Sequence, residues 1–280
     1  QGAAMAHEAP ASTIDRFDAD TFEHGGKARR VFRRGSGPAV LVIAEMPGIT
    51  PRVLGFAERV ADLGCTAVVP HLFGEPGRDP LADGRAATVR YLVSSLVPAC
   101  VSREFVVLAT GRTSPVVDWL RALARHEHRR CGGPGVGAVG MCFTGGFALA
   151  MSTIPEVVAP VLAQPSLPLT VGRRRRRTID ISPEDLAVVR DRCAEGLRVL
   201  GLRFEGDRLV GADRFAFLRE QLGDAFVAVE LPDEAAHPDA PGPAHSTLTE
   251  HLVDRPGTPT HDALTQVLDH FRTNLLTPRP

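Results

Sequence analysis

The sequence predicts an α/β fold in which a mostly parallel sheet is covered by helices on both faces. Two observations predict it. Short, continuous apolar runs rich in β-branched residues alternate with longer stretches in which apolar residues recur at helical spacing. Strands that alternate with helices are typical of parallel sheets. The strands of such sheets are buried on both faces, so each is a continuous apolar run instead of a mixture of apolar and polar residues.

Strands and helices are predicted in alternation along most of the chain. Continuous apolar runs predict strands over residues 39–44, 66–70, 136–140, 157–163, 197–204 and 226–231. Apolar residues at helical spacing predict helices over residues 51–64, 115–130, 213–223 and 261–276, and further helices open at 145 and 183. No repeat or composition break divides residues 16–280, which are expected to form a single domain. Residues 1–15 are expected to be disordered or tag-derived.

Capping residues mark three of these helix boundaries. Ser114 and Ser182 each precede a proline, which is the pattern of an N-cap followed by a proline in the first helical turn. Asp185 completes an S-x-x-D version of the capping box. Gly64 follows the apolar face of the first predicted helix and is expected to end it.

Composition excludes several classes of protein. Hydrophobic residues make up 44% of the 280 residues and charged residues 23%, which is enough for a core and excludes wholesale disorder. The 32 Lys and Arg residues balance the 33 Asp and Glu residues to a net charge of -1, which argues against binding to nucleic acid or to an anionic membrane. No apolar run approaches the roughly 18 residues that a membrane-spanning helix needs.

The cysteine pattern favours a reduced compartment. The cysteines are widely spaced and form no C-x-x-C pair: Cys65, Cys100, Cys131, Cys142 and Cys193. This is neither a disulfide framework nor a zinc site. Cys65 and Cys193 lie in apolar surroundings and are expected in the core, while Cys100 and Cys131 have no evident partner. Because the first residues contain no apolar signal segment, the protein is expected to be cytoplasmic.

The segment with the most chemical information is GMCFTGG at 140–146, between a predicted strand and a predicted helix. In a nucleophile elbow, the central residue occupies a sharp strand-to-helix turn whose small neighbours let it close. At Cys142 the helix N-terminus would stabilise a thiolate, and the N–H of Phe143 would point to where an oxyanion forms. The alternative is a buried structural cysteine beside a glycine-rich turn, and the motif alone does not separate the two.

An acid and a histidine follow this segment. Asp207 lies directly after a predicted strand, and His245 lies in the long loop after the last strand. The carboxyl ends of parallel strands share one edge of a sheet. The order nucleophile, acid, histidine is that of the α/β-hydrolases, in which His245 would move the proton and Asp207 would hold the ring in one tautomer. His237, in the same loop, is the alternative base.

These segments resemble the dienelactone hydrolase family over residues 38–271. Similar to it are AEMPG at 44–48, LFG at 72–74, GMC at 140–142, GD at 206–207 and AHS at 244–246. The resemblance implies an α/β-hydrolase fold that needs no cofactor and opens a small lactone or ester through a cysteine acyl-enzyme. Because His245 stands in the matching Ala-His-Ser segment, it is preferred to His237 as the base.

The resemblance also implies roles for the segment after the first core strand. Glu45 would help to deprotonate Cys142 when substrate arrives. The N–H groups of Met46 and Phe143 would form the oxyanion hole.

Two positions depart from the family. Thr144 replaces a usual glycine, which predicts a looser elbow or a different presentation of the cysteine. Thr249 replaces an arginine that holds a substrate carboxylate, which argues against dienelactone itself as substrate. These departures keep a second function open, that of a weak or non-enzymatic small-molecule or redox sensor with a reactive Cys142. The expected partner is a small ester or lactone, without nucleic acid or membrane, and the chain is expected to be a monomer or a homodimer.

Three other motifs are interpreted as structural. Residues 135–140 have the pattern G-x-G-x-x-G, but they form a predicted strand instead of opening a helix, so no dinucleotide site is expected. The arginine run at 173–177 is interpreted as a solvated loop. His126 and His128 lie two positions apart on a predicted helix, so they point in different directions and cannot share a metal ion.

Overall fold

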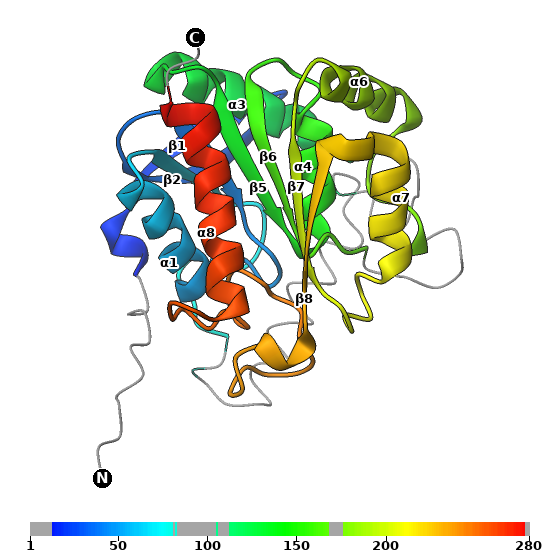
Figure 1. Ribbon diagram of the computed structural model, residues 1–280. Helices are drawn as coiled ribbons and strands as arrows, with labels where there is room; N and C mark the ends of the chain where they lie inside the picture. The colour runs from blue at the N-terminus through cyan, green and yellow to red at the C-terminus, as the bar shows by residue number, and fades with distance from the viewer. Residues whose placement is uncertain (1–12, 81, 83–104, 106–111, 168–175, 278–280) are drawn as a thin grey trace.

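The sheet combines a series of parallel strands with an antiparallel hairpin at one edge. The computed structural model describes residues 13–80, 82, 105, 112–167 and 176–277 (Figure 1). Its strands are β1 (Asp18–His24), β2 (Lys27–Gly35), β3 (Ala39–Ile43), β4 (Thr66–Pro70), β5 (Val136–Met141), β6 (Val157–Ala163), β7 (Val199–Phe204) and β8 (Phe226–Leu231). In the described residues they form one sheet of order β1-β2-β4-β3-β5-β6-β7-β8. β2 pairs antiparallel with β1 and β4, and the pairs from β4 onward are parallel.

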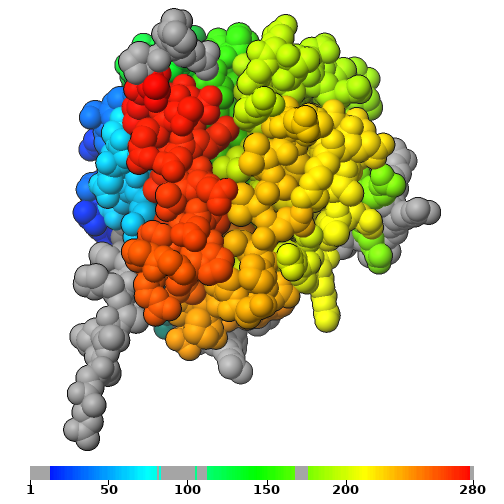
Figure 2. Space-filling model, viewed as in Figure 1, coloured from blue at the N-terminus to red at the C-terminus, as the bar shows by residue number. Residues whose placement is uncertain are grey.

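Helices cover both faces of this sheet, which confirms the predicted fold class. On one face lie α1 (Pro51–Asp62) and α8 (Pro259–Phe271), both on the side turned to the viewer in Figure 1 and Figure 2. On the other face lie α3 (Val116–Cys131), α4 (Gly145–Met151), α6 (Pro183–Ala194) and α7 (Ala212–Leu222). Shorter helical turns are η1 (Ile14–Arg16), η2 (Cys142–Thr144), η3 (Gly223–Ala225), η4 (Asp233–Ala235) and the π-helical η5 (Arg272–Leu276).

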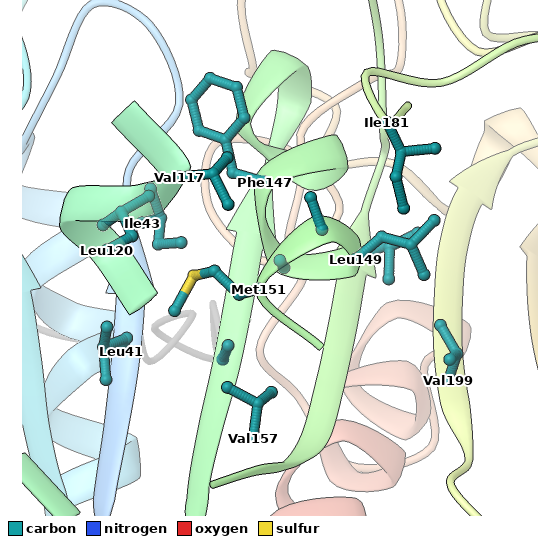
Figure 3. Packing of buried hydrophobic residues seen from close by; sticks show 14 of the residues in the cluster. Leu41, Ile43, Val117, Leu120, Phe147, Leu149, Met151, Val157, Ile181 and Val199 are labelled. Atoms are coloured by element: carbon teal, nitrogen blue, oxygen red, sulfur yellow. The ribbon is translucent and has the colours of Figure 1, made fainter. Parts of the chain in front are cut away.

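The central strands are buried on both faces. In β3, Leu41 and Ile43 belong to the apolar cluster under α3 and α4, whereas Val40 and Val42 belong to the cluster under α1 and α8. Figure 3 shows Leu41 and Ile43 on the side of the sheet that carries Phe147 of α4. Removal of apolar surface from water stabilises both layers, by roughly 25 cal/mol per Å². Two-sided burial is the reason why β3 is a continuous apolar run in the sequence.

The predicted strands are confirmed to within two residues. β4, β6 and β8 have the predicted bounds, β3 and β5 each differ by one residue, and β7 begins at Val199 instead of residue 197. The predicted closing helix is α8, and the last turn of that prediction is the π-helical η5.

Sequence patterns did not predict the hairpin of β1 and β2. β1 forms the edge of the sheet and is largely exposed, so most of its residues are polar and it shows no apolar run. Gly25 and Gly26 join the two strands, with φ angles of 58° and 73°. A two-residue Gly-Gly connection with positive φ is a tight hairpin turn, and it is the signal that could have located these strands.

Of the predicted capping residues, Ser182 and Gly64 are confirmed, whereas Asp185 and Ser114 are not, although α3 begins within one residue of its predicted start. The Ser182 hydroxyl accepts a hydrogen bond from Asp185 N at 3.1 Å, and Gly64 follows α1 with a φ of 98°. Asp185 does not complete the capping box, because its carboxylate pairs with a side chain of α3. The Ser114 hydroxyl caps no helix, because it donates to the buried carboxyl group of Asp180 at 2.5 Å.

The remaining motifs are structural in the described part of the chain. All but the first glycine of the G-x-G-x-x-G pattern lies in β5, so the pattern opens no helix. Cys65 and Cys193 are buried, as predicted, whereas Cys100 lies outside the described residues. The last two arginines of the run at 173–177 are exposed, and its first three lie outside the described residues.

No group of described His, Cys, Asp or Glu side chains could hold a metal ion. Among the described helices, none combines the length and the apolar character needed to cross a membrane.

Candidate active site

Cys142 occupies a sharp turn between β5 and α4. β5 ends at Met141, and η2 makes the turn before α4 begins at Gly145. The backbone of Cys142 has a φ of 57°, in the left-handed region that non-glycine residues rarely adopt. Such a conformation costs about 1–3 kcal/mol and persists only where the surrounding structure fixes it. The Cys142 side chain is partly exposed, so its sulfur is not sealed in the core.

The neighbours of Cys142 hold this turn closed. A Cβ atom on Gly140 would lie 2.1 Å from the carbonyl oxygen of Thr144, so only glycine fits there. Thr144 is fully buried, and its hydroxyl accepts a hydrogen bond from Met141 N at 2.8 Å. The same hydroxyl lies 3.0 Å from the carbonyl oxygen of Ile43. Thr144 therefore ties the turn to the end of β3, and does not leave it loose.

Ser166 contacts Cys142 from the end of the neighbouring strand. Its Oγ lies 3.0 Å from Sγ of Cys142, and its N–H donates to the Cys142 carbonyl oxygen at 3.0 Å. The Ser166 side chain is buried. Sequence patterns did not single out Ser166, because its local sequence has no motif. The signal that could have found it is its place just after β6, the strand next to β5.

Asp207 and His245 meet at the carboxyl edge of the sheet. Asp207 follows β7 and His245 lies in the loop after β8, and these two strands are neighbours. Asp207 Oδ2 lies 2.7 Å from His245 Nδ1. His237, the alternative base, instead accepts a hydrogen bond at its Nδ1 from Asp239 N at 3.3 Å. Among the described residues, the structure thus brings Asp207 together with His245 and not with His237.

The charges around His245 favour its protonated form. Burial lowers the pKa of the imidazole, but a thiolate at Cys142 and the carboxylate of Asp207 raise it, and the net pKa is about 11. The second ring nitrogen, Nε2, is buried and has no hydrogen-bond partner among the described residues.

Glu45 lies buried after β3, but its hydrogen-bond partners in the described chain do not include Cys142. Its Oε2 accepts hydrogen bonds from Ser246 Oγ at 2.7 Å and from Gln164 Nε2 at 3.2 Å. Its Oε1 accepts a hydrogen bond from the hydroxyl of Thr249. The position where the family has an arginine is thus occupied by a hydroxyl that is committed to Glu45.

The two backbone N–H groups predicted to bind an oxyanion are those of Phe143 and Met46. Phe143 follows Cys142 in the first turn of η2, where an N–H has no intrahelical acceptor. The N–H of Met46, just after Glu45, has no backbone acceptor in the described part of the chain. Neither group has an acceptor among the described residues, so either could donate to a ligand.

Aromatic side chains surround Phe143. Its ring centroid lies 5.3 Å from that of Phe73, 6.1 Å from that of Phe105 and 5.5 Å from that of Phe147. Phe73 belongs to the LFG segment after β4. The turn at Cys142 therefore has an apolar, aromatic side.

Comparison with known proteins identifies the family of the chain. The model of the dienelactone hydrolase family matches residues 28–182, which is more than half of the chain. The chain belongs to the dienelactone hydrolase family. This confirms the resemblance drawn from the sequence, and membership of this family supports a hydrolase function.

Several solved structures have the same α/β-hydrolase fold as this member of the dienelactone hydrolase family, although their sequence identity to it is low. A dienelactone hydrolase-like promiscuous phosphotriesterase from metagenomic libraries has 17% identity and a TM-score of 0.59, with 92% of this chain and 98% of that chain covered. A Klebsiella pneumoniae subsp. pneumoniae MGH 78578 protein described as a dienelactone hydrolase has 18% identity and a TM-score of 0.55, with 91% and 98% covered. A cold-adapted esterase from an Arctic intertidal metagenomic library has 16% identity and a TM-score of 0.53, with 92% and 93% covered. None of the curated proteins matches the sequence.

Proposed function

We propose that the protein hydrolyses a small carboxylic ester or lactone through an acyl-enzyme on Cys142. The observation that carries this proposal is the 2.7 Å contact between Asp207 and His245, taken together with a partly exposed cysteine on a strained turn. A nucleophile, a base near it and an acid that orients the base are the parts of a catalytic triad. Membership of the dienelactone hydrolase family supports the same reaction class.

In the first half-reaction, the thiolate of Cys142 attacks the carbonyl carbon, and the carbonyl π electrons move onto oxygen. The N–H groups of Phe143 and Met46 stabilise this oxyanion. When the intermediate collapses, the bond to the leaving oxygen breaks and the imidazolium of His245 gives that oxygen its proton. The product is a thioester, and with a lactone the released hydroxyl stays attached to the acyl group.

In the second half-reaction, the neutral imidazole of His245 takes a proton from water, and the water oxygen attacks the thioester carbon. Collapse of the second intermediate expels the Cys142 thiolate and releases a carboxylic acid. The thiolate and imidazolium are then restored, and no cofactor takes part. Asp207 holds the ring in one orientation through both halves.

The part of Glu45 in deprotonating Cys142 stays a prediction. The hydrogen bonds of Glu45 with Gln164, Ser246 and Thr249 support a second role, which is to hold the loop after β3 against the loop after β8. Since Thr249 is a neutral residue bound to Glu45, it supports an uncharged substrate over one that carries a carboxylate. A cytoplasmic location and a monomeric or homodimeric state also stay predictions.

Substitution of the nucleophile tests the proposal. Cys142→Ala and Cys142→Ser are compared with wild type on p-nitrophenyl esters of short acids, and Cys131→Ala, which changes another partly exposed cysteine, is the control. We expect both Cys142 variants to lose at least about 1,000-fold in kcat and the control to lose less than twofold, as for removal of other triad nucleophiles. In Cys142→Ala, alkylation of this site by iodoacetamide also disappears. Wild-type hydrolysis by Cys142→Ala would overturn the proposal.

Kinetics of the wild-type protein separate the enzyme from the sensor that the sequence leaves open. An enzyme gives a burst of acylation followed by steady turnover, because His245 can activate water for the second half-reaction. Release of one equivalent of p-nitrophenol per chain without turnover would support a sensor with a reactive Cys142.

A further inference from the structure

Gln164 has an unusual backbone conformation at the end of β6. In the described chain it is the one non-glycine residue besides Cys142 with a positive φ, at 36°. It is also fully buried. A strained backbone persists only where the surrounding contacts fix it, and a buried amide needs partners for both its donor and its acceptor. The contacts of this side chain therefore determine what it does.

The amide group of Gln164 joins two loops. Its Nε2 donates to Glu45 Oε2 at 3.2 Å, in the loop after β3. Its Oε1 accepts hydrogen bonds from Thr247 N at 3.1 Å and from the Thr247 hydroxyl at 2.7 Å, in the loop after β8. The backbone N–H of Gln164 donates to Leu202 O at 2.7 Å, which anchors the residue to β7.

Both loops carry groups of the proposed mechanism. Glu45 directly precedes Met46, whose N–H is an oxyanion donor in that mechanism. Thr247 lies two residues after His245. Because Ser246 Oγ also donates to Glu45 at 2.7 Å, the two loops and the end of β6 form one closed network of hydrogen bonds. A displacement of the Gln164 amide would shift both loops.

We propose that Gln164 is a positioning residue. It fixes the position of the Met46 N–H, which donates to the oxyanion in the proposed mechanism, relative to the imidazole of His245. The proposal rests on the proposed function. These two groups act on the two oxygens of the same tetrahedral intermediate, so their separation decides whether both can act at once. A misplacement of about 1 Å in such an arrangement costs on the order of 100-fold in rate.

Reversal of one hydrogen bond tests this proposal. Gln164→Glu keeps an acceptor for Thr247 but sets a second carboxylate against that of Glu45, at the site of the 3.2 Å contact. When Glu45→Gln is added, the new amide at position 45 can donate to the new carboxylate at position 164. The hydroxyls of Ser246 and Thr249 can donate or accept, so they adapt to either arrangement. The two single variants, the double variant and wild type form a double-mutant cycle.

When residue 45 is glutamate, we expect Gln164→Glu to lower kcat at least about tenfold. When residue 45 is glutamine, the same change should lower kcat less than about threefold, because residues 45 and 164 are then directly coupled by a restored hydrogen bond. KM for a p-nitrophenyl ester changes less than about threefold, because the displaced groups act on the intermediate and not on the bound ester. The same loss of kcat in both backgrounds would overturn the proposal, since it would show that the 45–164 contact is not what Gln164 contributes.

Gln164→Met supplies a second, independent test. Methionine has a similar length but makes none of the three side-chain hydrogen bonds, so kcat falls at least about tenfold. Circular dichroism and thermal unfolding check that the chain is folded. A wild-type kcat in folded Gln164→Met would overturn the proposal. If Cys142→Ala is inactive while the Gln164 variants are fully active, only the positioning role fails; if Cys142→Ala is active, the proposed function itself fails.

Discussion

Asp207 Oδ2 lies 2.7 Å from His245 Nδ1, although the two residues are 38 positions apart in the chain. The second carboxylate oxygen of Asp207 accepts hydrogen bonds from Leu209 N at 2.8 Å and from Val210 N at 3.3 Å, which fixes the carboxylate in the loop after β7. With Nδ1 held by this carboxylate, Nε2 is the nitrogen that remains for proton transfer. The position of one loop thus decides the tautomer of a histidine in another.

Asp207→Asn is expected to lower kcat by about 1,000- to 10,000-fold, as for the same change in a serine-protease triad. The reason is that an asparagine amide can keep its oxygen towards Leu209 N, so that its NH₂ group faces His245 Nδ1. The ring must then carry its proton on Nε2, where it cannot accept one. Steady-state hydrolysis of p-nitrophenyl esters measures the effect, and thermal unfolding close to that of wild type shows that the loop is intact. Asp213→Asn, an exposed change at the start of α7, is the matched control. A loss smaller than threefold in Asp207→Asn would contradict the assigned role.

The choice between two histidines of one loop is open to a direct comparison. His245→Gln is expected to lose about 100- to 10,000-fold in kcat, because no general acid remains for the leaving oxygen. His237→Gln is expected to stay within twofold of wild type, because in the described structure His237 Nδ1 bonds to Asp239 N and not to Asp207. Both variants are assayed on the same ester at the same pH. Equal losses in the two variants would argue that the loop is rearranged in solution.

The sequence predicts those features that depend on neighbouring residues. β4 and β6 are each marked by an apolar run, since parallel strands inside a sheet are buried on both faces. The turn at Cys142 is marked because Gly140, Cys142 and Gly145 lie within six residues of one another. Asp207 and His245 were selected by their place after strands and by the family resemblance, and the structure places them in contact.

What the sequence does not predict depends on contacts between distant loops. Ser166 against the sulfur and Gln164 against Glu45 arise only once β3, β5 and β6 lie side by side. An apolar run shows where a strand ends. It does not show which side chain after that end contacts the candidate site. Ser114 illustrates the same limit, because its hydroxyl bonds to Asp180, 66 positions away, instead of capping the helix that follows it.

Thr144→Val is expected to lower the free energy of unfolding by about 1–3 kcal/mol relative to Thr144→Ser. Valine has a similar shape but no hydroxyl, so the buried N–H of Met141 loses its acceptor, whereas serine keeps that hydrogen bond. Urea denaturation of the three proteins measures the difference. Since the same hydroxyl lies 3.0 Å from the Ile43 carbonyl oxygen, the valine variant also loosens the turn against β3, and its kcat is expected to fall. Equal stability of the valine and serine variants would contradict the role assigned to the Thr144 hydroxyl.

The burial of Asp180 predicts that the free energy of unfolding depends on pH, independently of catalysis. Its side chain is almost fully buried, and burial raises its pKa to about 7, although the hydrogen bond donated by Ser114 opposes this shift. An acid whose pKa is raised in the folded state destabilises the fold as pH rises from its unfolded pKa, about 4, to 7, by about 1.4 kcal/mol per pH unit. Asp180→Asn stays neutral and still accepts from Ser114, so its free energy of unfolding relative to wild type should increase between pH 5 and pH 7 and level off above that. Urea denaturation at pH 5, 6, 7 and 8 measures this difference, with Asp213→Asn as the exposed control. If the difference in the free energy of unfolding between Asp180→Asn and wild type stays constant from pH 5 to pH 8, Asp180 is ionised in the folded protein over this whole range and has a partner that stabilises its charge.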